Sequence, residues 1–466
     1  MSARTVNFGV PVMDGLLRIL ARKALATQLD DIPRDVIEIA KLGITDFFGV
    51  AYAGTDMPVA QNVRSYLNTI GLREGHAVLL GRDERADMIS ASLFNATAGH
   101  ALDFDDVSWA TIGHPSVVVA PCAIACAQAL KANGAALLRA YILGVELMHQ
   151  IARWTMPQLS ERGWHTTPAN GVFGTATVGA LLLGLNEDEF TNALAIAATR
   201  AFGVRANFGS QTKALHAGLC AQSGLECALL AKHGITGRDN AIEALDGYAQ
   251  CLANPITADQ VKIDFCEFWD LRETGLVIKQ YPCCSGTHPT LDIWDDFLNE
   301  HPLSADDIES IYAGVSLLGP RELSCHHPIN CVQAKFSLEY AIAARLIHGE
   351  VGVNTFTDEK VLDQRIQSFM KKVHMRIDPE LEKLGFIGTA PIRMRVTLKS
   401  GATIALANDL AMGNPEKPLT PVKFEKKFMN CVVPGADSEL ARVWWNTLQT
   451  IETATPEAIA SLGARS

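Results

Sequence analysis

Apolar residues recur at helical spacing from Met13 to about Ile263, and alanine and glycine are dense along the same stretch. This pattern predicts a helical region with little strand. One helix should begin close to Pro33, because proline favours the first helical turn and acidic side chains follow it. Residues 171–185 are apolar or small almost all round, so we expect a helix that is buried on every side.

The pattern changes after Asp264. Residues 310–318, 372–377 and 392–404 tend to alternate polar or small residues with apolar ones, which is typical of strands. The last of these segments contains Lys399-Ser400-Gly401 between two alternating arms, which predicts a hairpin. A helical segment at 336–347 should pack on the resulting sheet, and the chain reads as helical again after Pro418.

The length of 466 residues, 48% of them hydrophobic, exceeds the ~100–200 residues of an ordinary domain. Two domains are therefore expected. The segments are a helical part over 1–263, an α+β domain over 264–407 and a helical segment over 408–466 that would return to the first domain.

The formal net charge of -11 disfavours a nucleic-acid or anionic-membrane partner, because such binding depends on clustered lysine and arginine. It does not exclude an anionic substrate in a cleft that gathers a few cations. No apolar run approaches the ~20 residues that cross a bilayer, and residues 1–7 lack a secretory pattern, so we expect a cytoplasmic protein. The 11 cysteines are scattered and odd in number, which indicates reduced thiols rather than a disulfide framework.

Residues 99–116 carry the densest set of ionisable side chains, including Asp103, Asp105, Asp106 and His114. Three carboxylates this close should raise the pKa of at least one, which suits a general acid or base. A structural interpretation is equally open, in which Asp103 and Asp106 cap helices and His114 caps a helix that starts at Pro115.

Two further segments place cationic or titratable groups on helices. His165 directly precedes the expected buried helix, whose N-terminus would attract anions and favour a neutral imidazole. Lys213 and His216 are three residues apart and share one helix face. The alternatives are a hydrogen-bonding histidine and a solvated surface lysine, although the small residues around Lys213 favour its burial.

A fourth segment, residues 279–289, includes Lys279, Cys283, Cys284 and His288. Adjacent cysteines do not easily form a tetrahedral ligand set, and no third partner is evident, so no metal site is predicted. The chain also lacks the short, open cysteine spacings that hold iron–sulfur clusters. We therefore expect an enzyme with no metal and no organic cofactor.

Taken together and in this order, the segments resemble the MmgE/PrpD family, which includes 2-methylcitrate dehydratases, cis-aconitate decarboxylases and iminodisuccinate epimerases. The resemblance covers nearly the whole chain. Its motifs are His-Ala-Leu-Asp-Phe-Asp-Asp, Gly-His-Pro-Ser, Gly-Trp-His-Thr-Thr, Thr-Lys-Ala-Leu-His-Ala-Gly, Tyr-Pro-Cys-Cys-Ser-Gly-Thr-His, Ala-Lys-Phe-Ser-Leu-Glu-Tyr and Asn-Pro-Glu-Lys-Pro-Leu-Thr.

The resemblance implies a mainly α fold: a large all-helical domain built from both chain ends, with a smaller α+β lid domain inserted, in a homodimer. It implies an active site between the domains with catalytic residues Asp103, His114, His165 and Lys213. Substrate-binding residues are expected from a second set: Ser108, Lys279, Cys284 and His288.

The sequence departs from the family pattern at four places. Val107 stands where cis-aconitate decarboxylases often carry threonine, which leaves Ser108 as the candidate hydroxyl. Cys284 replaces a histidine of those decarboxylases, and their tyrosine before an Arg-Pro segment has no obvious match near residues 324–328. The Asn-Asp-Thr-Trp type of motif found in methylcitrate dehydratases is also missing. The substrate is therefore left open.

The leading functional hypothesis is a lyase or isomerase that removes a proton next to a carboxylate of a small di- or tricarboxylate. Dehydration, decarboxylation and epimerisation all fit it. One alternative is a magnesium-dependent prenyl diphosphate enzyme that uses Asp103, Asp105 and Asp106, although the aromatic content of 7% is low for a terpenoid cavity. The other is a non-catalytic helical scaffold.

Overall fold

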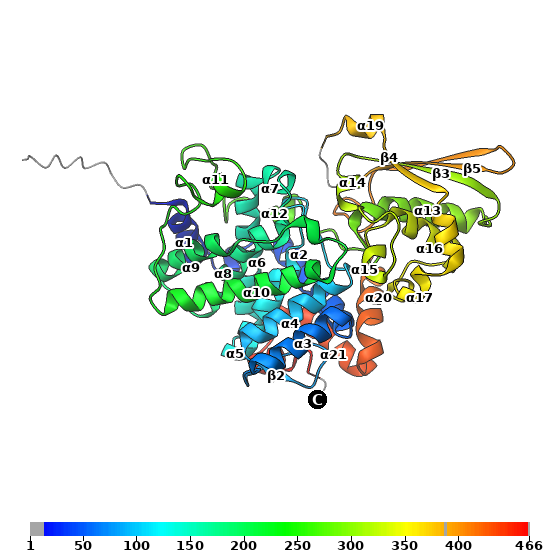
Figure 1. Ribbon diagram of the computed structural model, residues 1–466. Helices are drawn as coiled ribbons and strands as arrows, with labels where there is room; N and C mark the ends of the chain where they lie inside the picture. The colour runs from blue at the N-terminus through cyan, green and yellow to red at the C-terminus, as the bar shows by residue number, and fades with distance from the viewer. Residues whose placement is uncertain (1–13, 386–388, 465–466) are drawn as a thin grey trace, which may run out of the picture.

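Helices form most of the protein in the computed structural model, which describes residues 14–385 and 389–464 (Figure 1). Residues 1–7, on which the localisation expectation depends, lie outside the described residues. The helices of eleven or more residues are α1 (Leu16–Ala26), α2 (Arg34–Gly54), α3 (Pro58–Ile70), α4 (Met88–Ala101), α5 (Ser116–Leu130), α6 (Gly134–Thr155), α8 (Thr166–Leu182), α9 (Glu187–Arg200), α10 (Gln211–Lys232), α13 (His288–Glu300), α16 (Leu338–His348), α20 (Pro421–Val432) and α21 (Ser438–Gln449). The predicted mainly α fold is confirmed.

Shorter helices connect these elements. They are α7 (Gln158–Glu161), α11 (Tyr248–Leu252), α12 (Asp270–Glu273), α14 (Gly319–Glu322), α15 (Cys331–Ala334), α17 (Asp358–Val361), α18 (Gln364–Met370), α19 (Pro379–Glu382) and α22 (Pro456–Ser461), with 3-10 turns η1 (Leu29–Asp31), η2 (Arg205–Asn207), η3 (Ser285–Thr287), η4 (Val353–Thr355), η5 (Val433–Gly435) and η6 (Ile451–Thr453).

One four-stranded sheet lies in the second half of the chain, and we call residues 281–408, which include it, the sheet unit. Its strand order is β4-β3-β5-β6, formed by β3 (Ile308–Val315), β4 (Val373–Ile377), β5 (Ile392–Leu398) and β6 (Thr403–Asn408). β3 pairs parallel with β4 and antiparallel with β5, while β5 and β6 form the predicted hairpin. Helices α13 and α16 pack on the sheet (Figure 1). A separate two-stranded pair, β1 (Ala77–Val78) and β2 (Arg85–Ala86), lies in the helical part.

The centre of the helical part is the close packing of α4, α8 and α10. Every residue of α8 from Thr166 to Ala180 is buried, which agrees with the predicted burial of residues 171–185 up to Ala180. The remainder of that prediction is wrong, because residues 181–183 are only partly buried and Gly184 is exposed beyond the end of the helix. Glycines allow the close approach: a Cβ on Gly218 of α10 would lie 2.5 Å from the carbonyl oxygen of Leu93 in α4. No helix of the described residues is both long and apolar enough to cross a membrane.

The C-terminal helices pack against the N-terminal part of the chain. Phe48 of α2 stacks on Phe428 of α20, and its ring contacts the edge of Trp444 in α21. These side chains belong to one hydrophobic core with α5, α6, α8 and α10, while the sheet unit has its own core around Trp294 and Ile311. The domain division at 263/264 and 407/408 stays a prediction.

The prediction of a helical region up to about Ile263 is wrong for its last thirty residues, where α11 is the one helix that forms. Gly234 adopts φ +91 just after α10, and Asp246 also has a positive φ of 64. Such left-handed positions end helices, so apolar residues here, such as Ile242, are buried from loops.

The close packing of α10 on α4 predicts a cost for adding one methyl group at Gly218. The new Cβ would meet the carbonyl oxygen of Leu93, which is part of a helix backbone, and Thr97 Oγ1. Gly218→Ala should lower the free energy of unfolding by ~1–3 kcal/mol, as overpacking does. Gly352→Ala is the matched control, because nothing lies within 4 Å of that position. Equal denaturation midpoints for the two variants would contradict the packing account.

Candidate active site

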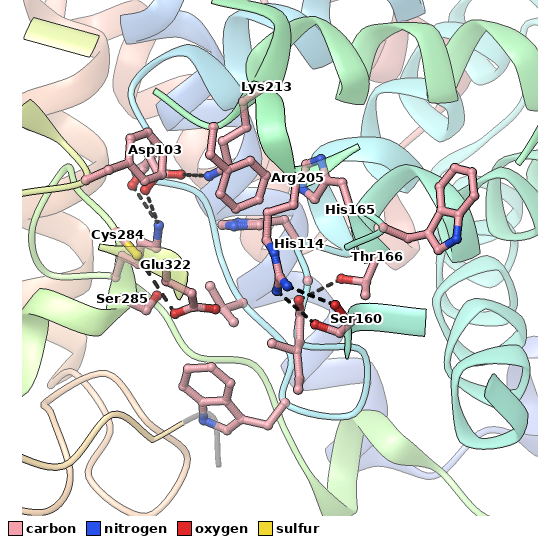
Figure 2. A pocket seen from close by; sticks show the side chains of 18 residues that line it. Asp103, His114, Ser160, His165, Thr166, Arg205, Lys213, Cys284, Ser285 and Glu322 are labelled. Carbon is pink, nitrogen blue, oxygen red and sulfur yellow. Dashed lines mark hydrogen bonds and ion pairs between the residues drawn. The ribbon is translucent and has the colours of Figure 1, made fainter. Parts of the chain in front are cut away.

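A pocket opens between the helical part and the sheet unit (Figure 2). Both regions contribute side chains to its wall, including Phe208 from the helical part and Phe336 from the sheet unit. Six of the eight residues expected from the sequence line this pocket: Asp103, His114, His165, Lys213, Lys279 and Cys284.

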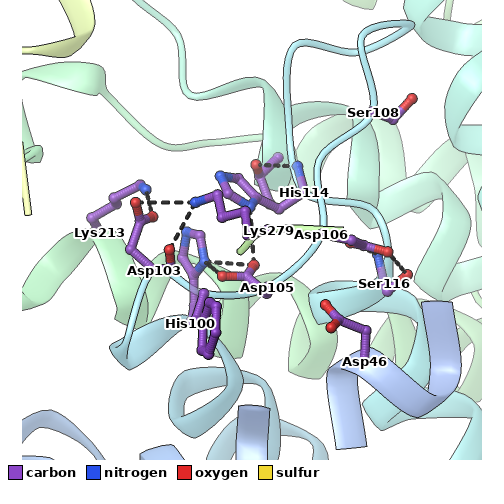
Figure 3. Close-up of polar contacts among 12 residues, drawn as sticks. Asp46, His100, Asp103, Asp105, Asp106, Ser108, His114, Ser116, Lys213 and Lys279 are labelled. Carbon is purple, nitrogen blue, oxygen red and sulfur yellow. Dashed lines mark hydrogen bonds and ion pairs between the residues drawn. The ribbon is translucent and has the colours of Figure 1, made fainter. Parts of the chain in front are cut away.

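Asp103 is the centre of the pocket's charge network. It lies two residues beyond α4 with a left-handed φ of 51 and is 2% exposed. One carboxylate oxygen pairs with Lys213 Nζ, and the other lies 3.2 Å from Lys279 Nζ. Lys279 also donates to the Asp103 carbonyl oxygen at 2.8 Å. One buried carboxylate therefore holds two buried ammonium groups (Figure 3).

These lysines decide the ionisation of Asp103. Burial is the largest single influence and opposes ionisation, but Lys213 and Lys279 outweigh it and hold the Asp103 pKa well below its usual value. Burial works against the charged form of Lys279 too, yet Asp103 and Asp105 leave its pKa raised. Lys279 therefore stays charged beside the ionised Asp103 at neutral pH.

Two aromatic rings flank the ammonium group of Lys213, in addition to its ion pair with Asp103. It lies in the first turn of α10, which Ser210 caps by accepting a hydrogen bond from Thr212. Its ammonium group lies 5.0 Å from the ring centroid of Phe208 and 4.8 Å from that of Phe336. The second ring belongs to the sheet unit, so Lys213 contacts both walls of the pocket.

Four imidazoles extend away from this cluster. His100 contacts His114 edge-on at 4.6 Å between centroids and stacks on His165 at 6.0 Å. His165 in turn lies 3.1 Å from His216, measured between their Nδ1 atoms. Burial lowers the pKa of His100 and of His216 to about 4 and lowers those of His114 and His165. All four rings are therefore neutral at pH 7.

The three neighbouring aspartates have three different surroundings. Asp105 accepts from His100 Nδ1 at 2.9 Å and lies 3.0 Å from His114 Nδ1, so it orients both imidazoles. Asp106 accepts from the backbone N–H and the hydroxyl of Ser116 at the start of α5. Its pKa is raised well above the usual value by burial and then by Asp46, as expected for one of the crowded carboxylates. The capping interpretation therefore suits Asp106 and not Asp103.

Ser108 and His288 do not reach the pocket lining. Ser108 is buried in a tight turn in which its backbone pairs with Gly113, and Figure 3 shows its side chain away from Asp103 and the lysines. His288 begins α13 and lies 3.2 Å from the carbonyl oxygen of Cys283, with its ring edge against Tyr281. Their predicted contact with substrate has no geometric support.

Two charged pocket residues were missed from the sequence. Arg205 in η2 donates to Ser160 Oγ at 3.2 Å and to the Ser160 carbonyl oxygen at 2.9 Å. Glu322 ends the short helix α14 and faces the pocket beside Cys284 and Ser285 (Figure 2). Arg205 follows Gly203 by two residues, and Glu322 follows Gly319 by three. A search for ionisable residues close to glycines could therefore have identified both.

Two groups of the described residues have a geometry that could hold a metal ion, and neither is the Cys283–His288 segment. In the first, Asp105 already bonds His100 and contacts His114. In the second, Glu146 accepts two backbone N–H groups of α12, and Asp270 pairs with Arg153. These protein partners account for the carboxylates of both groups.

The pocket combines three chemical capacities. The paired lysines and Arg205 can bind carboxylates and stabilise negative charge that develops on them. The neutral imidazoles of His114 and His165 can accept a proton. The flanking aromatic rings exclude water from the ammonium group of Lys213, which strengthens these electrostatic effects. Such a set fits proton transfer next to a carboxylate.

Comparisons with protein-family models give two matches. The MmgE/PrpD N-terminal domain matches residues 18–260, and the MmgE/PrpD C-terminal domain matches residues 281–453. The pocket described above is lined from both matched regions, together with Lys279 between them.

Several curated proteins are similar over most of their length. The chain is 28% identical to a cis-aconitate decarboxylase of Homo sapiens, over 84% of this chain and 82% of the relative. It is 27% identical to the Mus musculus cis-aconitate decarboxylase with the same coverage. For the Aspergillus terreus cis-aconitate decarboxylase the identity is 24%, over 83% of each chain.

Removing the carboxylate of Asp103 should strongly destabilise the protein, because two buried ammonium groups would lose their counter-charge. We expect Asp103→Ala to lower the free energy of unfolding by ~3–5 kcal/mol at pH 7. Adding Lys213→Met and Lys279→Met should recover most of that loss. Asp56→Ala is the control: its side chain is 76% exposed in a pair with Arg82, and the expected cost is below ~1 kcal/mol. Urea denaturation gives the free energy of unfolding of Asp103→Ala, of the triple variant and of Asp56→Ala. Similar losses for Asp103→Ala and Asp56→Ala would contradict the claim that Asp103 stabilises the two buried lysines.

Proposed function

This chain belongs to the MmgE/PrpD family, and we propose that it is a cofactor-independent enzyme that acts on a small di- or tricarboxylate. The observation that supports this most strongly is the pairing of Asp103 with two buried lysines beside neutral imidazoles. The two lysines share one carboxylate, so an anionic ligand in the pocket would supply further counter-charge to their buried ammonium groups. We also propose a homodimer, as the family resemblance implies, and a cytoplasmic location.

In the proposed reaction, Lys213 and Lys279 bind a substrate carboxylate and stabilise the enediolate-like charge that develops on it. His165, with a neutral ring in the pocket, transfers the proton at the neighbouring carbon, and His114 serves as the second acid or base. Asp103 fixes the positions of the two ammonium groups through its two carboxylate oxygens. Asp105 orients His114 through the contact at its Nδ1.

Among the family's reactions, decarboxylation is our first candidate, because the relatives described above are named cis-aconitate decarboxylases. The carbon–carbon bond to one carboxylate would break, carbon dioxide would leave, and a proton would add to the remaining carbon. Dehydration and epimerisation use the same proton transfer and remain within the proposal. Cys284 is one of the positions at which this chain departs from the family pattern. Its Sγ lies 4.0 Å from Oε2 of Glu322.

A magnesium-dependent diphosphate enzyme finds little support in the pocket. Its metal site would need several free carboxylates facing one cavity. Asp103 is bound by two lysines, Asp105 by His100, and Asp106 by Ser116 at the start of α5. Bringing these carboxylates to one cation would break all three sets of contacts.

The proposal is tested by a substrate panel of cis-aconitate, 2-methylcitrate, citrate and iminodisuccinate, after dialysis of the protein against a chelator. We expect turnover of at least one member, followed by absorbance and by release of carbon dioxide. Matched monocarboxylates should be neither bound nor converted. Turnover that requires added magnesium or iron, or thermal stabilisation by monocarboxylates as strong as by dicarboxylates, would overturn the proposal.

His165→Ala and Lys213→Ala should each reduce the turnover rate on the substrate found by ~100-fold or more, the scale usual for a general acid or base. His374→Ala is the matched control, because His374 is exposed on β4 and outside the pocket. Circular dichroism should show folded protein in each case. Near-normal turnover by both pocket variants would mean that the assigned residues do not carry the reaction.

A further inference from the structure

Glu322 is an acidic side chain in a pocket whose proposed ligand is a polyanion. It ends α14 and lies with Cys284 and Ser285 on the sheet-unit wall, across the pocket from Lys213 (Figure 2). Its only hydrogen-bonding contact within the described residues is a long one of 4.0 Å from Cys284 Sγ to Oε2. A polycarboxylate in the pocket would therefore meet a carboxyl group that is not already neutralised by a cation.

The cationic side chains of the pocket have partners other than Glu322. Lys213 and Lys279 pair with Asp103, and Arg205 is hydrogen-bonded to Ser160. No lysine, arginine or histidine of the described residues lies within 4.0 Å of Glu322 as an ion-pair partner. An ionised Glu322 would repel a second or third substrate carboxylate, whereas a protonated one could donate a hydrogen bond to it.

The surroundings of Glu322 favour the protonated form. Burial is the largest influence and raises its pKa to about 7, against the opposing effects of Arg205, Lys213 and Lys279. Asp103 acts in the same direction as burial. A bound polyanion would raise the pKa further, because the added negative charge disfavours ionisation of a neighbouring carboxyl group.

We propose that Glu322 is a specificity-determining residue that binds as the neutral carboxylic acid and donates a hydrogen bond to a substrate carboxylate. The proton comes from the solvent, so the site takes up one proton for each polycarboxylate that it binds. This inference rests on the proposed function, since it needs a polycarboxylate ligand. It adds a reason why such ligands are accepted beside an acidic residue: the proton taken up removes the repulsion.

The histidines and cysteines around the pocket keep their charge state between pH 6 and 8. His100 and His216 titrate at about pKa 4 and His288 at about 3, while burial raises the pKa of Cys283 to about 12 and that of Cys284 further. Lys335 is the nearest competitor, because burial lowers its pKa to about 8 and Asp103 faces it. Its Nζ donates to the Ala101 carbonyl oxygen, behind the Asp103 cluster.

Proton uptake can be counted directly by isothermal titration calorimetry of the full-length protein at pH 7.5. The probes are the four panel polycarboxylates, titrated in buffers of different ionisation enthalpy. For the wild-type protein we expect most of one proton to be taken up per ligand. Affinity should fall with rising pH, approaching tenfold per pH unit above pH 7, because the free state must then be protonated before the ligand binds.

The decisive variant is Glu322→Gln, which keeps the shape of the side chain and cannot titrate. It should take up almost no proton, and its affinity should be nearly constant from pH 6 to 8. Glu309→Gln, at an exposed position of β3, and Lys335→Arg should both behave like the wild-type protein.

The outcomes separate this inference from the proposed function. If no polycarboxylate binds the wild-type protein, the proposed function fails and the inference fails with it. If a polycarboxylate binds without proton uptake, only the inference is overturned, and this result needs no variant. Uptake that persists in Glu322→Gln, or disappears in Lys335→Arg, would assign the proton to another group and overturn the role of Glu322.

Discussion

The arrangement of the site depends on one constraint, which is that two ammonium groups buried in the protein interior must share a single carboxylate. Asp103 meets it because the chain turns through a left-handed conformation just after α4 and points the carboxylate between Lys213 and Lys279. The three residues come from the end of one helix, the start of another and the segment before the sheet unit. These ion pairs therefore link the three segments at the pocket.

Burial has opposite chemical consequences for the lysines and the histidines around this cluster. The ammonium group of Lys279 stays charged because Asp103 and Asp105 oppose the effect of burial. Around His114 and His165 the neighbouring charges do not outweigh burial, so the pKa of each imidazole is lowered and both rings are neutral. Fixed cations next to neutral bases are what removal of a proton beside a carboxylate requires. On the opposite wall, Glu322 is the one acidic group of the described pocket lining that no lysine holds.

The hydrophobic pattern was sufficient to predict the helical part, the strands, the hairpin and the burial of α8, since these follow from periodicity. It overestimated helix before residue 263, where left-handed backbone positions end the helices. For the site, the resemblance to the MmgE/PrpD family implied that Asp103, His114, His165 and Lys213 line one active site, and the four residues do lie around one pocket. The motifs alone left a structural interpretation open. They could not show that Asp106 faces Ser116 or that Ser108 lies in a closed turn, because side-chain direction in a loop depends on tertiary contacts. Glu322 was missed for a related reason: α14 reaches the pocket only through the fold of the sheet unit.

The central claim is that this cluster of charges and neutral imidazoles transfers a proton at the carbon next to a substrate carboxylate. The most direct measurement is incubation of the protein with the panel polycarboxylates in deuterated water, followed by mass spectrometry of the recovered substrate and product. If the reaction is a decarboxylation or an epimerisation, the account predicts deuterium at that carbon with the wild-type protein and far slower labelling with Lys213→Ala. A decarboxylated or epimerised product without deuterium at that carbon, or labelling at the same rate in both proteins, would contradict it.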